Sequence, residues 1–81
     1  AGLRKEEERL KEELYNLRIK NKEDRRSYRS DIKKLLKEER PLAKEKLRMM
    51  TEEMKEAENL LKEKIKETVR TRKERERMIR D

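Results

Sequence analysis

The apolar residues of this chain recur at intervals of three, four and seven residues, the spacing of one face of an α-helix. In the first half this face consists of Leu3, Leu10, Leu14, Leu17, Asn21, Asp24, Tyr28, Ile32 and Leu35. In the second half it consists of Ala43, Leu47, Met50, Met54, Ala57, Leu61, Ile65, Thr68 and Arg72. Each face is a narrow stripe of the kind that forms a seam between two helices. The pattern predicts an all-α protein with helical halves at 3–40 and 42–81, within one coiled-coil segment spanning 1–81.

The single proline, Pro41, lies close to the midpoint of the chain and must disturb a helix there. The chain either turns back between Lys37 and Leu42 to form a hairpin, or continues as a kinked helix roughly 120 Å long that dimerises. The segment KEERPLAK contains no Gly, Asn, Ser, Thr or Asp to cap a tight reversal. We therefore favour the continuous helix, kinked or interrupted near Pro41, over the hairpin.

The charges predict the direction of pairing. Residues 1–17 carry a net charge of −1, 18–34 carry +5, 35–63 carry −1 and 64–81 carry +4. A parallel partner would place the +5 block against itself, whereas an antiparallel partner places each basic block beside a more acidic one. With paired residue numbers adding to about 82, the apolar stripes also align. Antiparallel pairing is therefore expected, in a dimer of continuous helices or in a hairpin.

Two polar residues, Asn21 and Asp24, fall inside the first stripe. A polar side chain at an inward position lowers stability and can fix the register or the number of partners. The alternative is a loosely packed section of the seam that remains in contact with water. The pattern does not decide between these two interpretations.

The composition excludes several classes of function. Of the 81 residues, 58% are charged and 30% hydrophobic, which is too few for a globular core. Such a composition also occurs in disordered chains, but the persistent stripe favours a helix. Without Cys or His we expect no enzymatic activity, no metal site and no cofactor. No apolar run could span a membrane, so we expect a cytoplasmic or nuclear location. The start at Ala1-Gly2 suggests a piece excised from a larger protein.

We therefore expect this chain to be a non-enzymatic oligomerisation or scaffolding segment, as found in cytoskeletal, centrosomal, motor or tethering proteins. The expected partner is a second copy in an antiparallel homodimer, or another coiled-coil protein. The expected oligomer interface consists of Leu3, Leu10, Leu14, Leu17, Asn21, Tyr28, Ile32, Leu35, Leu47, Met50, Met54, Ala57, Leu61, Ile65 and Thr68.

A basic block within 18–34 suggests an alternative function, binding to an acidic partner such as a microtubule or actin surface, nucleic acid or anionic lipid. The candidate contacts are Arg18, Lys22, Arg25, Arg26, Arg29 and Lys33. A plainer interpretation is a solvated helix face, balanced by the glutamates of a partner helix. Only Tyr15 and Tyr28 offer aromatic rings for base stacking, which argues against nucleic acid. An effector helix pair for a small GTPase is a further alternative that no residue selects.

Overall fold

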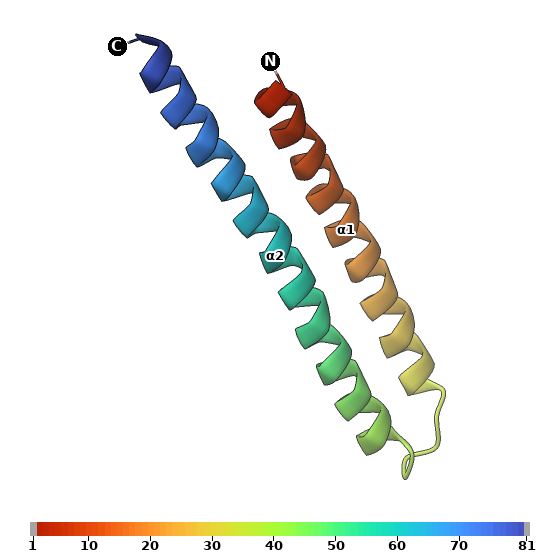
Figure 1. Ribbon diagram of the computed structural model, residues 1–81. Coiled ribbons are helices and arrows are strands. Elements are labelled where there is room, and N and C mark those ends of the chain that lie inside the picture. The colour runs from red at the N-terminus through yellow and green to blue at the C-terminus, as the bar shows by residue number, and fades with distance from the viewer. Residues whose placement is uncertain (1, 81) are drawn as a thin grey trace.

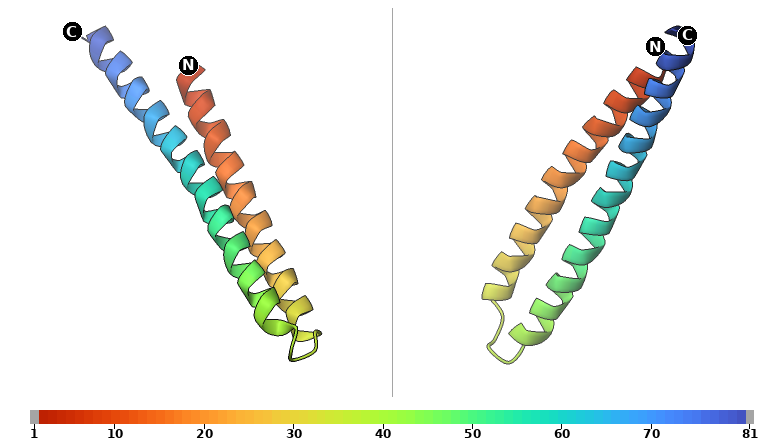
Figure 2. Two further views of the ribbon diagram at one scale, coloured as in Figure 1. Left: turned by 60° about the horizontal axis from the view of Figure 1, so that its bottom comes forward. Right: turned by 90° about the vertical axis from the view of Figure 1, so that its left-hand side faces the viewer.

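Two long helices account for nearly all of the chain. The computed structural model describes residues 2–80, apart from the side chain of residue 80. Helix α1 spans Gly2–Lys33 and helix α2 spans Arg40–Arg80. The helices lie side by side and run in opposite directions (Figure 1), in a rod with principal extents of 67 × 16 × 10 Å. Figure 2 shows from two further sides that the linker is at one end and both termini are near the other. No strand occurs in residues 2–80, which confirms the all-α prediction.

The helix that was predicted to continue past Pro41 is instead interrupted at residues 34–39. The backbone N–H groups of Lys34 and Leu35 each donate a hydrogen bond, 3.0 Å long, to the carbonyl three residues earlier. Such bonds tighten the last turn of a helix and satisfy carbonyls that have no partner four residues ahead. The first helix therefore ends at Lys33, not at residue 40, and the chain reverses.

The missing cap of this reversal comes from the second helix. The Arg40 guanidinium donates hydrogen bonds to the carbonyl of Leu35, at 3.2 Å, and to that of Lys33, at 3.4 Å. A positive group at the carboxyl end of a helix satisfies free carbonyls and complements the helix dipole. No residue from 2 to 80 has a positive φ, so the turn needs neither Gly nor Asn. The chain forms a hairpin without the expected capping residues because the Arg40 side chain caps the first helix.

Pro41 is the second residue of α2, where a proline causes no disruption. The backbone N–H of Ala43 donates to the carbonyl of Glu39 at 3.3 Å, one turn back. The N–H groups before residue 43 have no such partner within the helix, so the missing N–H of Pro41 removes no helical bond. Its fixed φ also suits the first turn of a helix. Pro41 therefore begins a helix and does not kink one.

The core is a thin layer between the two helices. Leu10, Leu14 and Leu61 form a buried cluster, and the half-buried Leu17 and Ile65 pack against it. Nearer the linker, Ile32 and Ala43 are also buried. None of the described side chains is less than 2% exposed. Since each helix covers only one side of the other, the fold depends on a small number of apolar contacts and on polar contacts beside them.

Candidate interaction surfaces

The residues predicted to contact another chain lie mostly between α1 and α2 of the same chain. The buried ones are Leu10, Leu14, Asn21, Ile32 and Leu61. The half-buried ones are Leu3, Leu17, Tyr28, Leu35, Leu47, Met50, Met54, Ile65 and Thr68. Ala57 is exposed, and the neighbouring Glu58 is half-buried in its place. We call this layer the seam. Its role between two chains stays a prediction.

Side-chain contacts across the seam define its register. Asn21 contacts Glu58, and Arg25 contacts Met54, so the numbers of facing residues add to about 79. The pattern of apolar residues predicts a sum of about 82, so the observed register differs by three residues, nearly one helical turn. In the observed register Leu14 lies level with Ile65, not with Thr68. The shift places the amide of Asn21 beside a carboxylate instead of beside a leucine.

A polar layer interrupts the seam near its middle. The side chain of Asn21 is 5% exposed, and its Nδ2 donates to Oε2 of Glu58 at 3.1 Å. The other carboxylate oxygen of Glu58 lies 3.4 Å from Nε of Arg18. No buried side-chain nitrogen or oxygen among the described residues lacks a partner. Because an unpaired buried polar group is costly, any register that separates Asn21 from Glu58 is disfavoured.

One polar position of the first stripe was misplaced. Asp24 was predicted to point inward, but its side chain is exposed. The next residue, Arg25, is half-buried, and its guanidinium donates to Sδ of Met54 at 3.7 Å. The aliphatic part of an arginine can cover apolar surface while its charged end stays near water. The inward face therefore passes through residue 25.

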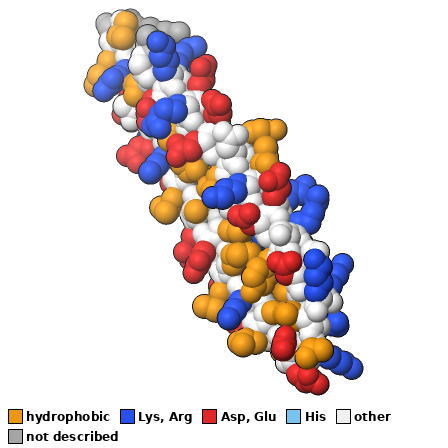
Figure 3. Space-filling model, turned by 90° about the vertical axis from the view of Figure 1, so that its right-hand side faces the viewer, with side chains coloured by type: hydrophobic (Ala, Val, Ile, Leu, Met, Phe, Trp, Pro, Cys, Tyr) orange, Lys and Arg blue, Asp and Glu red, His pale blue; other side chains and the backbone are white. Residues whose placement is uncertain are grey.

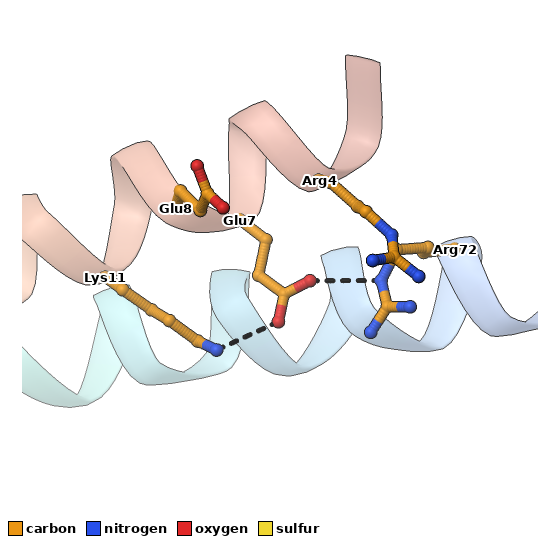
Figure 4. Close-up of a pocket in the computed structure, with 5 residues that line it drawn as sticks. All are labelled: Arg4, Glu7, Glu8, Lys11 and Arg72. Atoms are coloured by element: carbon orange, nitrogen blue, oxygen red, sulfur yellow. Dashed lines mark hydrogen bonds and ion pairs between the residues drawn. The ribbon is translucent and has the colours of Figure 1, made fainter. Parts of the chain in front are cut away.

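A cluster of ion pairs joins the two helices near the termini (Figure 4). Oε1 of Glu7 lies 3.0 Å from Nζ of Lys11, and Oε2 accepts a hydrogen bond from Nε of Arg72, also at 3.0 Å. Arg72 also contacts Oε1 of Glu76 at 3.2 Å, and Arg4 reaches the same oxygen at 3.4 Å. The acidic residues near the start of the chain thus meet basic residues near its end.

These contacts shift the pKa values of both carboxyl groups. The hydrogen bond from Lys11, followed by the nearby charges of Lys11 and Arg72, lowers the pKa of Glu7 below its ordinary value, although burial opposes the shift. The hydrogen bond from Arg72 has the same effect on the pKa of Glu76. Both groups are therefore ionised more readily in the folded chain, and their ion pairs stabilise the ends of the seam.

The six predicted contacts for an acidic partner are divided by the structure. Arg18 is engaged with Glu58, and Arg25 is half-buried beside Met54. The other four are exposed: Lys22, Arg26, Arg29 and Lys33. Only these four present their charge to solvent without a contact across the seam.

Several apolar side chains remain outside the seam. Tyr15, Leu36, Leu42 and Leu60 are each 65% exposed. Figure 3 shows apolar, acidic and basic side chains interspersed along one face of the rod, with apolar groups most numerous toward the linker. Within α2, Leu42, Met49 and Leu60 are separated by seven and eleven residues, which places them on one side of the helix. This row is a surface that another helix could cover.

The described residues contain no group of three or more Asp or Glu arranged to hold a metal ion. Neither α1 nor α2, as far as they are described, is long and apolar enough to cross a bilayer. Comparison of the chain with models of protein families, with curated proteins and with solved structures gave no match.

Proposed function

We propose that this chain is a non-enzymatic helix-pairing segment that scaffolds a larger assembly by forming an antiparallel coiled coil with a second copy. The observation that supports the proposal best is the polar layer at Asn21 and Glu58, beside the leucine cluster of the seam. Such a layer costs stability and favours one register over its neighbours. A segment whose task is to pair helices in a defined alignment needs this property.

Exchange of helices supplies the route from a hairpin to a dimer. If the linker at residues 34–39 straightens, α1 of one copy can pair with α2 of another through the contacts that are now made within one chain. The exchanged dimer then differs from two hairpins mainly in the linker and in the entropy of association. Its population should rise with protein concentration, because two chains combine to form it.

Disulfide cross-linking tests this proposal directly, since the chain contains no cysteine. The variants Leu14→Cys and Ile65→Cys are prepared separately, mixed at high concentration, allowed to equilibrate and oxidised gently. These positions lie level with each other in the leucine cluster. Pairing between copies predicts that the covalent 14-to-65 heterodimer dominates over both homodimers.

The matched control replaces Leu14→Cys by Tyr15→Cys, whose side chain is 65% exposed on the outer side of α1. This mixture should give few heterodimers, because the thiols meet only by collision. A Leu14→Cys/Ile65→Cys double variant measures the hairpin, since it closes a disulfide within one chain. If the double variant closes efficiently and the mixed single variants give no more heterodimer than the control, pairing between copies is refuted.

A further inference from the structure

One flank of α1 carries a continuous row of basic residues. Positions three or four residues apart follow one side of a helix. On this flank they are Lys11, Arg18, Lys22, Arg26, Arg29 and Lys33, interrupted by Tyr15. The opposite flank of α1, one third of a turn to the other side of the seam, carries Glu6, Glu13, Asp24 and Asp31 among its residues. The positive charge of α1 is therefore concentrated on one side of the hairpin.

α2 carries a matching row. The same spacing connects Lys44, Arg48, Lys55, Lys62, Lys66 and Lys73 along one flank of this helix. Thr51, Asn59 and Val69 occupy the intervening positions. Glu58 lies where this flank meets the seam, and Arg48 is paired with Glu45 and Glu52 beside the flank. Six of the nine positions of this row are basic, which does not follow from the amphipathic pattern of the seam.

Contacts across the seam place both rows on the same face. Arg18, in the α1 row, reaches Glu58, which lies between Lys55 and Lys62 at helical spacing. On the other side of the seam, a shallow hollow brings Glu13 of α1 together with Lys64 and neighbouring residues of α2. The acidic flank of α1 therefore faces away from both basic rows. We call the side that carries the two rows the basic face.

In the half of the basic face nearest the linker, most of the Lys and Arg side chains have no carboxylate partner. Arg48, between Lys44 and Lys55, is paired with Glu45 and Glu52. The other exposed side chains of the rows in this half form no ion pair with a carboxylate of the described residues; they are Lys22, Arg26, Arg29, Lys33, Lys44 and Lys55. Paired numbers that add to 79 place these two groups at the same level of the rod. Residues 22–33 span only about 17 Å of helix axis. Four unpaired cations of α1 and two of α2 thus lie side by side over about this distance.

We propose that the basic face binds the phosphate backbone of double-stranded nucleic acid. A duplex presents about one negative charge per 1.7 Å of its axis, which suits two extended rows of Lys and Arg. Binding in the plane of a membrane would need large apolar side chains beside the charges, and the rows contain none between 22–33 or 44–55. Single strands would need several aromatic rings for stacking, but Tyr28 is half-buried in the seam. The exposed Tyr15 is a single ring and lies outside residues 22–33. The face thus fits backbone contact without reading of bases.

Fluorescence anisotropy with a labelled DNA or RNA duplex of about 20 base pairs, close to the 67 Å length of the rod, tests this proposal. The test variant is Lys22→Gln/Arg29→Gln/Lys44→Gln/Lys55→Gln. We expect wild-type binding to weaken steeply with salt. The logarithmic salt slope of the variant should be smaller by about 3 to 4, since each phosphate contact contributes about 0.9, and its affinity at low salt should be at least tenfold weaker.

The matched control is Lys20→Gln/Lys46→Gln/Lys64→Gln/Arg75→Gln, which removes the same four charges from exposed positions off the basic face. Its salt slope should stay within about 1 of the wild type. Glutamine is a good helix former, so circular dichroism should show both variants folded. Lys44→Gln/Lys55→Gln alone should lower the slope by about 2 and provides a milder test of the α2 row.

Three results would overturn the proposal. Equal losses in the test and control variants would mean that net charge, and not the basic face, controls binding. If the wild-type protein binds neither duplex but binds vesicles of phosphatidylserine and phosphatidylcholine, the partner of the basic face is a lipid surface instead. Binding to polyglutamate but to neither duplex would identify an acidic protein. The cross-linking experiment on helix exchange is unaffected by any of these outcomes, so the two proposals fail separately.

Discussion

Leu61 and Leu60 are neighbours in sequence but have opposite environments, which makes them a sharp test of the seam. Leu61 is 9% exposed in the cluster with Leu10 and Leu14, whereas Leu60 is 65% exposed. Leu61→Ala should cost about 2–3 kcal/mol of unfolding free energy. We take the lower part of the usual range because only one helix covers the site and it can relax. Leu60→Ala should change the free energy by less than about 0.5 kcal/mol.

The corresponding change in melting temperature is large for a protein of this size. An unfolding entropy of about 2.1 cal/mol/K per residue gives about 0.17 kcal/mol/K for 81 residues, so Leu61→Ala should lower Tm by roughly 15 °C. Leu60→Ala should lower it by about 3 °C or less. Both variants change helix propensity equally, so their difference reports burial alone.

Thermal melts followed by circular dichroism at 222 nm, at two protein concentrations, measure these shifts. Equal shifts for the two variants would show that the seam does not hold the helices together as described. A larger effect at Leu60 that grows with concentration would mean that the outer row of α2 is buried in an assembly. Either result would refute the account of the core.

Three further predictions concern polar contacts. Asn21→Ala should lower the unfolding free energy by about 1–3 kcal/mol in denaturant titrations, because the Glu58 carboxylate loses a partly buried donor. The control Asn16→Ala, at an exposed position, should change it very little. Equal effects of the two variants would contradict the polar layer. The pKa of Glu7 is lower in the folded chain than in the unfolded chain, where it is about 4.3. The stability that this difference contributes is complete above the unfolded pKa and is lost as pH falls through the folded pKa. The free energy of unfolding, measured from pH 7 to 2, should therefore depend less on pH in Glu7→Gln. Arg40→Gln should leave the last carbonyls of α1 without the Arg40 hydrogen bonds and lower the unfolding free energy by about 0.3–1 kcal/mol. The end of α1 should then open more often, so amide hydrogens near residue 33 should exchange faster. Unchanged exchange would show that the cap is not needed.

The helical class and most inward positions could be predicted from spacing, but two positions could not. From Met54 to Leu61 an inward residue at either 57 or 58 satisfies the helical period, and an apolar rule selects Ala57. The structure instead turns Glu58 inward, toward Asn21. The same ambiguity between residues 24 and 25 concealed Arg25. The missing signal was a polar partner on the other helix, which becomes visible only when the register is known.

The reversal of the chain was hidden for a similar reason. Rules for helix ends look for a capping residue within a few positions of the last turn. Here the capping group is the side chain of Arg40, seven residues beyond Lys33, and it reaches the carbonyls only after the chain has turned. In this chain Arg40 and Pro41 therefore begin the second helix after the reversal. The basic face was hidden for the same reason, since its two rows lie side by side only when α1 and α2 are paired.

The position of both chain ends near one end of the rod determines how the molecule responds to tension (Figure 1). A force that pulls the first turn of α1 away from the last turn of α2 acts on the contacts one after another. The ion pairs around Glu7 and Arg72 would carry the load first, then the leucine cluster, then the polar layer at Asn21. Such peeling requires much less force than sliding two helices past each other, which breaks all contacts at once. As a hairpin the segment is a weak mechanical link, whereas an exchanged antiparallel dimer pulled from its two far ends would resist in shear.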